Sequence, residues 1–313
     1  MKKTVSTLGE KNLIKKIIKE FGTEYIGDDA AILDNKHNDL VFTSDMLIES
    51  HHLPKQMTKE EIGFKIVTVN ISDIIAMGAK PIGFLLNIAI PKNMTIEDFN
   101  KLINGVKKGC QYYKVPLLGG DTNEAEEIIL SGTAIGTTPK NKSTRKTTAK
   151  KGDLIGITGK IGLAALGFQT LNTKPKTKYT QYLQEKILKP KAKLTGEKIG
   201  QYANSLTDIT DGLAEELYEM KNKKIGFKIY YNKIPIDEEY EKIVKELNLN
   251  IEELLFHFGE DFELVFTINK EELKNLKDTE YYIIGEVTDT GQVELVKDED
   301  IKILPEKGYQ HLN

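Results

Sequence analysis

Six short segments of this chain combine aspartates, glycines and small hydroxyl residues after apolar runs. A carboxylate at the end of a buried strand is costly unless it is paired, and several converging carboxylates cannot all stay ionised without a cation between them. Mg²⁺ takes oxygen ligands and is commonly bound together with substrate phosphates. The recurrence therefore predicts a phosphate site with several metal ions, although any single segment is also typical of a turn. The segments are residues 26–30, 42–46, 70–73, 118–122, 207–212 and 259–262.

The first three segments supply carboxylates from different kinds of element. Asp28 and Asp29 are adjacent, so one can face a metal ion while the other bonds to the backbone. We expect Asp45 to lie on a strand and Asp73 to lie inside an apolar helix. A solvent-exposed Asp73 is the alternative, because aspartate is easily solvated.

The fourth and fifth segments have features that suit a phosphate ligand. Two adjacent glycines, of which Gly120 is the second, let the backbone approach a ligand closely, and Asp121 could then hold a bridging cation. Asp208, Thr210 and Asp211 come just before a predicted helix. These residues could serve only to cap that helix, but a helix N-terminus also suits phosphate.

Motifs for other kinds of chemistry are missing from the sequence. It contains no Gly-x-x-x-x-Gly-Lys-Ser/Thr phosphate loop and no protein-kinase signature set. No order of Ser, His and Asp indicates covalent catalysis. His51 and His52 could bind a metal ion, although a surface histidine pair is common.

Composition narrows the class of protein. The chain has 313 residues, of which 39% are hydrophobic and 29% charged, as in globular proteins. Its 44 basic and 47 acidic side chains nearly balance, which argues against nucleic-acid binding. A single cysteine, Cys110, excludes an internal disulfide and predicts a reducing compartment, the cytoplasm. Neither a signal-peptide pattern nor the roughly 20 apolar residues of a membrane span is present, so we expect no membrane partner.

Strands alternate with helices in both halves of the chain, and a polar, lysine-rich stretch at residues 139–152 separates the halves. The pattern predicts an α/β (α+β) fold in two domains, residues 1–139 and residues 150–313. In the first domain we expect helices at residues 9–18, 60–77 and 95–113, and strands at 41–43, 84–90, 115–118 and 128–137. In the second domain we expect helices at residues 192–202, 212–221 and 240–247, and strands at 154–158, 227–231, 262–268 and 281–287.

The order of the motifs resembles the thiamine-monophosphate kinase family. The motifs are Gly-Asp-Asp, Thr-Ser-Asp-Met, Val-Asn-Ile-Ser-Asp-Ile-Ile-Ala-Met-Gly-Ala, Gly-Gly-Asp-Thr, Asp-Ile-Thr-Asp-Gly-Leu and Gly-Glu-Asp-Phe-Glu-Leu. The resemblance covers residues 9–285 and extends to the superfamily of aminoimidazole ribonucleotide synthetase and selenophosphate synthetase. It implies a two-domain fold of that superfamily, with an N-terminal mixed sheet and helices and a C-terminal α/β domain that closes over the site. It also implies a homodimer whose N-terminal sheets join.

The resemblance further implies an activity and its site residues. The γ-phosphoryl group of ATP would pass to thiamine monophosphate, giving ADP and thiamine diphosphate in the last step of thiamine diphosphate biosynthesis. One departure is Ile103, which stands where the family often has a tyrosine that contacts the nucleotide. The implied Mg²⁺ shell is Asp28, Thr43, Ser44, Asp45, Asp73, Asp121, Asp208 and Asp211. The implied ATP contacts are Gly120, Asp121, Arg145 and Thr210, and the implied acceptor contacts are His52, Glu260 and Tyr309.

The expected mechanism depends on positioning and charge neutralisation rather than on a protein nucleophile. Several Mg²⁺ ions held by many carboxylates can bridge two phosphate-bearing substrates. Asp45 and Asp73 would then be catalytic through metal-assisted, direct in-line transfer, and Arg145 offers a guanidinium suited to phosphate. Two alternatives stay open: another ATP-using enzyme of the superfamily, such as aminoimidazole ribonucleotide synthetase, and a non-catalytic nucleotide-binding relative.

Overall fold

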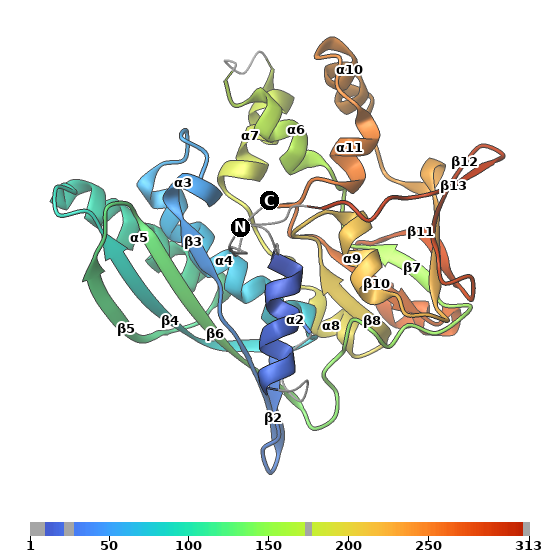
Figure 1. Ribbon diagram of the computed structural model, residues 1–313, viewed down its shortest axis with the longest axis horizontal. Helices are drawn as coiled ribbons and strands as arrows, with labels where there is room; N and C mark the ends of the chain where they lie inside the picture. The colour runs from blue at the N-terminus through green and yellow to red at the C-terminus, as the bar shows by residue number, and fades with distance from the viewer. Residues whose placement is uncertain (1–9, 22–27, 173–176, 309–313) are drawn as a thin grey trace, which may run out of the picture.

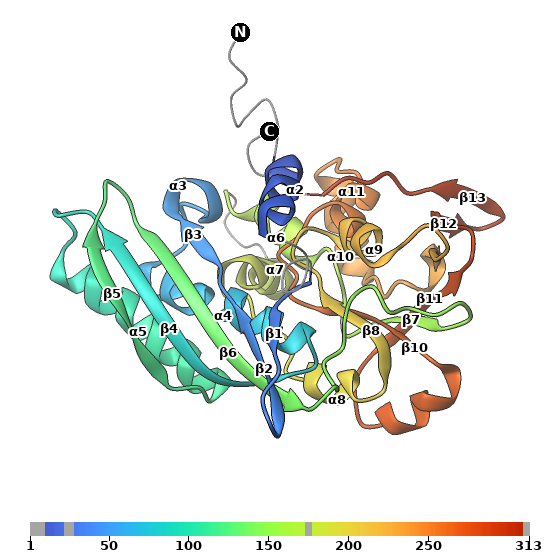
Figure 2. The same cartoon turned by 60° about the horizontal axis from the view of Figure 1, so that its bottom comes forward.

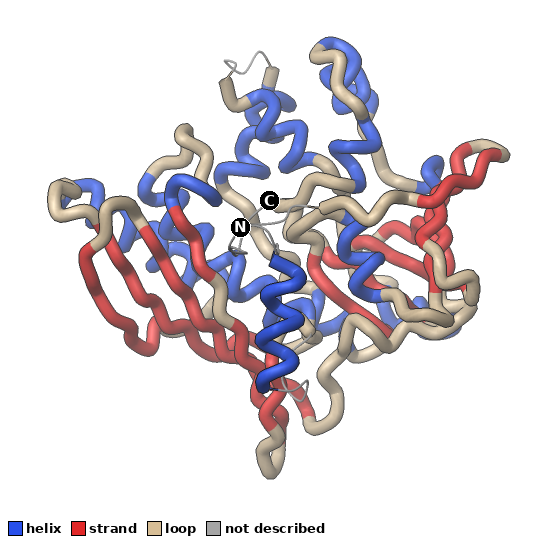
Figure 3. Tube along the Cα trace, viewed as in Figure 1, coloured by secondary structure: helices blue, strands red, loops and turns tan. Residues whose placement is uncertain are grey.

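The computed structural model describes residues 10–21, 28–172 and 177–308. It contains two β-sheets with helices packed between and around them (Figure 1, Figure 3). Strands up to residue 139 belong to the first sheet, and strands from residue 154 belong to the second. The predicted α/β class is confirmed, whereas the domain limits 1–139 and 150–313 stay a prediction.

The first sheet is mixed, as expected. Its order is β1–β2–β6–β4–β5, and β3 also pairs with β6. Strands β4 and β5 are parallel, whereas the other neighbours are antiparallel. Strand β5 forms one edge, and all eight of its residues are exposed. The strands are β1 (Ala31–Leu33), β2 (Asn38–Thr43), β3 (Met46–Ile48), β4 (Lys80–Ile90), β5 (Leu117–Glu124) and β6 (Ile129–Pro139).

The second sheet has the order β13–β12–β9–β11–β7–β10–β8. Only β12 and β9 are parallel among its neighbouring pairs. Strand β8 is an edge strand on the side of the first domain, so its C-terminal end can face helices of that domain. The strands are β7 (Leu154–Ile157), β8 (Ala203–Asp208), β9 (Gly226–Tyr230), β10 (Leu264–Ile268), β11 (Tyr282–Thr288), β12 (Val293–Lys297) and β13 (Asp300–Ile303).

The two long helices begin at residues that cap them. Thr58 and Glu61 form a capping box at the start of α4, and the Thr95 side chain accepts a hydrogen bond from the Asp98 N–H at the start of α5. Both predicted helices are therefore confirmed to within about two residues. The first-domain helices are α2 (Glu10–Phe21), α3 (Glu49–His52), α4 (Lys59–Ala76) and α5 (Ile96–Tyr113). The second-domain helices are α6 (Leu163–Thr170), α7 (Lys178–Leu188), α8 (Gly196–Gly200), α9 (Leu213–Met220), α10 (Glu238–Glu246) and α11 (Ile251–Phe256), with 3₁₀ turns η1 (Tyr231–Lys233) and η2 (Lys270–Leu276).

Helix α4 lies between the two sheets (Figure 1, Figure 2) and contacts α5 and β6 on one side and β8 on the other. One hydrophobic core runs from Ile66 and Ile71 of α4 to Leu206 of β8 and Phe266 of β10. Val265, the neighbour of Phe266, belongs to a second core on the opposite face of the second sheet. Because the domains share the first core, α4 fixes their relative position.

Three segments differ from the sequence expectation. Strand β5 continues to Glu124, so Gly120 and Asp121 lie inside a strand rather than after it. Asp45 lies between β2 and β3 rather than on a strand. The helix predicted at residues 192–202 is reduced to α8, because the preceding backbone bonds to the first domain instead: Ala192 N–H donates to the Tyr113 hydroxyl at 2.9 Å. In the described part of the chain, no helix is both long and apolar enough to cross a membrane.

Candidate active site

Asp73 lies at the centre of an acidic cluster between the two domains. It belongs to α4, and the Thr43 hydroxyl at the end of β2 donates a hydrogen bond to its Oδ2 at 2.5 Å. Burial raises the pKa of Asp73 well above its usual range, and the charges of Asp45, Asp208 and Asp29 raise this pKa further. The structure therefore does not support the alternative of a solvent-exposed Asp73. The four aspartates come together from both domains.

Asp208 joins the cluster from the second domain. It ends β8 with only 3% of its surface exposed. The Ser72 hydroxyl of α4 donates a hydrogen bond to Asp208 Oδ2 and so connects the two domains at this point. Burial, followed by the charge of Asp29, raises the pKa of Asp208 to about 7.

Asp45 is held through its backbone. Its N–H donates to Asn70 Oδ1 at 3.0 Å, and its carbonyl accepts from the Gly132 N–H at 2.8 Å. The neighbouring Ser44 hydroxyl donates to the Gly132 carbonyl at 2.7 Å. Burial raises the pKa of Asp45, and its carboxylate can share a proton with Asp73. The carboxyl group of Asp45 is thus left to face the cluster.

The adjacent Asp28 and Asp29 have different environments, as two neighbouring acids after glycine should. Asp28 Oδ1 accepts from the backbone N–H of Asp29 at 3.2 Å and of Lys146 at 3.3 Å. Asp29 faces the cluster, and Lys146 Nζ lies 3.3 Å from Asp29 Oδ1 and 2.6 Å from Glu219. Arg145 is exposed, with a guanidinium nitrogen 3.9 Å from Asp28 Oδ2. The sequence left open which acid of the Asp28–Asp29 pair faces the site, and the family resemblance implied Asp28; Lys146 was missed.

The cluster has the chemistry of a site for hard divalent cations. Burial raises the pKa of Asp29 to about 6 in spite of Lys146, so ionisation of these acids is opposed until positive charge arrives. Within the described ranges, no three acidic, histidine or cysteine side chains could hold a metal ion by themselves. Mg²⁺ is usually bound by one or two carboxylates together with water and substrate phosphates. The oxygen donors therefore fit Mg²⁺ ions shared with phosphates rather than a cage made only of protein.

The loop after β8 packs closely on the loop before β10. Glu260 N–H donates to the Thr210 carbonyl at 2.9 Å, and Phe262 N–H donates to the Ile209 carbonyl at 3.0 Å. A Cβ on Gly259 would lie 1.6 Å from the Thr210 carbonyl oxygen, so only glycine fits there. Glu260 and Phe262 have φ angles of 69° and 50°, which are unusual for side-chain-bearing residues. These contacts connect two of the six sequence segments.

Glu216 on α9 supports the same region, and sequence reasoning missed it. Its Oε1 accepts hydrogen bonds from the N–H groups of Thr210 at 3.2 Å and Asp211 at 3.0 Å. Burial raises the pKa of Glu216 well above its usual range, and the charge of Asp211 raises this pKa further. An acid on the buried side of α9, beside Leu213 and Leu217, was the signal that could have revealed it.

The two described acceptor-site candidates, His52 and Glu260, meet at one lysine. Lys65 Nζ donates to the His52 carbonyl at 3.1 Å and lies 2.5 Å from Glu260 Oε2. His52 Nδ1 accepts from the Ile48 N–H at 2.8 Å, so the neutral ring carries its hydrogen on Nε2. The third candidate, Tyr309, lies outside the described residues.

Asp121 and Gly120 are not brought to this cluster within one chain. Asp121 pairs with Asn87, Asn87 with Ser131, and Ser131 with Met46, next to Asp45. Three strand spacings therefore separate Asp121 from Met46, which amounts to about 14 Å. The Asp121 carboxylate instead accepts from the N–H of Thr122 at 2.9 Å.

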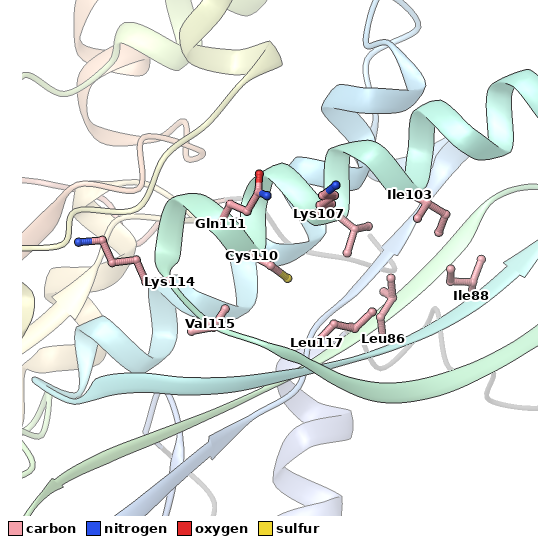
Figure 4. Close-up of a pocket in the computed structure, with 10 residues that line it drawn as sticks. Leu86, Ile88, Ile103, Lys107, Cys110, Gln111, Lys114, Val115 and Leu117 are labelled. Atoms are coloured by element: carbon pink, nitrogen blue, oxygen red, sulfur yellow. The ribbon is translucent and has the colours of Figure 1, made fainter.

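Ile103 lines a cleft of about 450 Å³ between α5 and strands β4 and β5. Leu86, Ile88 and Leu117 of the strands face Ile103 and Cys110 of the helix (Figure 4). The lining is mainly apolar, and Lys107 and Lys114 are among its other residues. A tyrosine at position 103 would lie in this cleft, so the sequence departure changes the shape of the cleft.

The fold and site define a class of protein. Residues 27–138 match the family described as AIR synthase related protein, N-terminal domain, and residues 150–298 match AIR synthase related protein, C-terminal domain. Within that class, the chain belongs to the thiamine-monophosphate kinase family. The thiamine-monophosphate kinase of Pyrococcus horikoshii is 37% identical over 98% of this chain and 97% of its own. That of Methanocaldococcus jannaschii is 36% identical over 90% of this chain and 92% of its own.

A solved structure agrees with these sequence matches. The structure of AaThiL complexed with AMPPCP and TMP superimposes with a TM-score of 0.91 and is 28% identical, covering 99% of both chains. The predicted two-domain fold of the superfamily is therefore confirmed over nearly the whole length.

Proposed function

We propose that this protein transfers the γ-phosphoryl group of ATP to thiamine monophosphate and releases ADP and thiamine diphosphate. The observation that carries the proposal is the convergence of the half-buried Asp45 and Asp73 with the buried Asp208, from both domains, into one cluster. Phosphate-bearing substrates need such a charge-neutralising site. The names of the relatives and the ligands of AaThiL, an ATP analogue and TMP, support the choice of substrates.

The chain's own residues position the acids before any substrate arrives. Thr43 orients Asp73, Ser72 orients Asp208, and Glu216 fixes the backbone after β8. When bound, Mg²⁺ supplies positive charge that offsets the phosphates. We propose that it is held by the predicted shell together with Asp29; that shell is Asp28, Thr43, Ser44, Asp45, Asp73, Asp121, Asp208 and Asp211.

Substrate contacts follow the same proposal. Gly120, Asp121, Arg145 and Thr210 would contact ATP, and His52, Glu260 and Tyr309 would contact thiamine monophosphate. The hydrogen bond from the Ile48 N–H to His52 Nδ1 would hold the ring in place beside the acceptor. A phosphate oxygen of the acceptor forms the new bond to the γ-phosphorus while the bond to the β–γ bridging oxygen of ATP breaks. No residue becomes phosphorylated.

The assembly and location are also proposals. A homodimer would cover β5, an exposed edge strand in which Leu117 and Leu118 are 52% and 54% exposed. Exposed apolar edges are usually covered or blocked in native proteins. Asp121 lies on this strand, so its role in nucleotide binding would depend on the dimer. We place the protein in the cytoplasm, where its buried single cysteine stays reduced.

The test is formation of thiamine diphosphate from ATP and thiamine monophosphate, with and without Mg²⁺, followed by chromatography. We expect Mg²⁺-dependent product and no ATP hydrolysis above background without the acceptor. Folded protein that makes no thiamine diphosphate would contradict the proposal. Turnover with an aminoimidazole ribonucleotide precursor would favour the alternative superfamily activity, and nucleotide binding without turnover would favour a non-catalytic relative.

Direct transfer has its own test. After incubation with γ-³²P-ATP alone, the protein should carry no covalent label, and a chiral γ-phosphorus should be inverted in the product. Covalent label or retained configuration would indicate a phosphorylated enzyme.

A further inference from the structure

Lys65 is the most deeply buried lysine of the described chain, with 1% of its side chain exposed. It lies on α4, in the first domain, among the residues of the shared core. A buried ammonium group is strongly unfavourable unless it is paired and hydrogen-bonded. Its ion-pair and hydrogen-bond partners therefore explain how the buried ammonium group is tolerated.

Those partners come from both domains. The His52 carbonyl at the end of α3 accepts a hydrogen bond at 3.1 Å, and the Glu260 carboxylate of the second domain lies 2.5 Å away. Neither contact belongs to a regular helix or sheet ladder. Lys65 thus joins the last residue of α3 to a loop residue of the second domain, and the fold would otherwise leave these two residues independent.

The strained backbone at Glu260 indicates that the surrounding structure holds this residue in position for its contact with Lys65. Its φ of 69° costs free energy in a residue that has a Cβ. The conformation is imposed by the bond from Glu260 N–H to the Thr210 carbonyl and by the close approach at Gly259. The same strained loop is therefore tied to the loop of Thr210 and Asp211 on one side and to Lys65 on the other.

We propose that Lys65 is a positioning residue for the phosphoryl acceptor. It holds His52 and Glu260 in a fixed relative position across the domain boundary. Both residues can then contact thiamine monophosphate without a further loss of conformational entropy. The inference rests on the proposed function, in which these two residues contact the acceptor. It implies that Lys65 contributes to the affinity for thiamine monophosphate but not to the affinity for ATP.

The decisive measurement separates the two substrates. In Lys65→Met, we expect the KM for thiamine monophosphate to rise at least tenfold, while the KM for ATP changes less than twofold. In Glu260→Gln, we expect a similar rise. Because Lys65 and Glu260 act as a pair, their effects should not add. The acceptor KM of the double variant should exceed the higher of the two single-variant values by no more than about twofold. Lys108→Met is the matched control, since Lys108 also pairs with a glutamate, Glu60 of α4 at 2.6 Å, but on the surface.

A purely structural ion pair would give a different result. It would lower the melting temperature and the amount of active enzyme while leaving both KM values unchanged, or it would raise both KM values together. Either pattern overturns the inference. If wild-type protein makes thiamine diphosphate and Lys65→Met keeps its acceptor KM, then this inference fails alone. If wild-type protein makes none, then the proposed function fails.

A second measurement uses the wild-type protein and needs no variant. Hydrogen exchange of the wild-type protein is followed with thiamine monophosphate and no ATP. We expect residues 49–53 and residues 257–263 to become protected together, at the same acceptor concentration. Protection of only one segment would contradict the coupling through Lys65.

Discussion

At the scale of single residues, neighbouring side chains decide what each acid of the site does. Asp28 and Asp29 are adjacent, yet Asp28 accepts backbone hydrogen bonds while Asp29 faces the cluster. Asp73 and Asp208 each receive a hydroxyl hydrogen bond, from Thr43 and Ser72. These hydroxyl groups orient the carboxylates without adding charge, which leaves the acids available for cations.

Replacing Asp73 with asparagine tests the centre of the cluster. Asp73→Asn keeps the size of the side chain but removes a negative charge that the proposed phosphate-bound Mg²⁺ ions would need. We expect kcat to fall by about 10²-fold or more, the scale of lost electrostatic stabilisation. Turnover is measured over a series of Mg²⁺ concentrations, because Mg²⁺ is held by few protein ligands together with substrate phosphates. Near-wild-type kcat at low Mg²⁺ would contradict a metal-ligand role, and Asp98→Asn on the exposed start of α5 is the control.

Cys110 gives a pH-dependent prediction outside the acidic cluster. Burial raises the pKa of its thiol to about 11. The thiolate is the reactive form, so alkylation of the folded protein at pH 8 should be about 100-fold slower than that of the unfolded chain. The rate should rise about tenfold for each pH unit up to roughly pH 11.

The raised pKa of Cys110 also determines how stability changes with pH. Folding disfavours the Cys110 thiolate, so this thiol's contribution to the free energy of unfolding is lost as pH rises above the unfolded pKa of about 8.5. Iodoacetamide kinetics with mass spectrometry measure the reactivity. A pH-independent rate, or equal rates for folded and unfolded chains, would contradict the burial of Cys110.

At the scale of elements, helix α4 organises the site because it is buried on nearly all sides. It presents apolar residues to both sheets, while Asn70, Ser72 and Asp73 point their polar groups to three different partners. The loops at the end of β8 and before β10 complete the site. They are connected by backbone hydrogen bonds rather than by side chains.

Gly259→Ala tests that connection. The added methyl group would lie 1.6 Å from the Thr210 carbonyl oxygen, so the two loops must separate. We expect a loss of stability of about 2–3 kcal/mol, as for overpacking, and at least a tenfold loss in kcat/KM for the acceptor.

The control for Gly259→Ala is Gly152→Ala. Gly152 has a φ of 87° and nothing within 4 Å of an added Cβ. It should cost about 1 kcal/mol through backbone strain without a change in kcat/KM. Equal kinetic effects of both substitutions would show that the loop contact is not specific.

At the scale of the whole molecule, the described chain brings most of the predicted acids together but leaves Asp121 about 14 Å from the cluster by strand spacing. The exposed edge strand β5 also lines the cleft between α5 and the first sheet, through Leu117. A second copy placed along β5 would cover this apolar surface. The complete nucleotide site would then depend on assembly as well as on folding.

The homodimer is tested by the mass in solution. We expect light scattering to give about 71 kDa, twice the 35.3 kDa of one chain. Leu118→Lys places a charge on the exposed β5 edge, and it should shift the mass toward the monomer and raise the KM for ATP. Ile301→Lys is the matched control, because Ile301 is 60% exposed on β13 of the other sheet. A wild-type monomer with full activity would contradict the proposed assembly.

The sequence alone determined much of this protein, and the tertiary structure decided the rest. Apolar periodicity predicted α4 and α5, because this signal acts over a few residues. The repeated Asp and Gly motifs predicted an acidic phosphate site for the same reason, and their order indicated the family.

Which acids meet was decided only by packing. The orientation of Asp29 toward the cluster, the burial of Lys65 and the separation of Asp121 depend on contacts between residues more than 30 positions apart. The shortened α8 has the same cause, since the backbone before it bonds to Tyr113 of the other domain. Local sequence carries no measure of such distances, because they are set by how two sheets pack on α4.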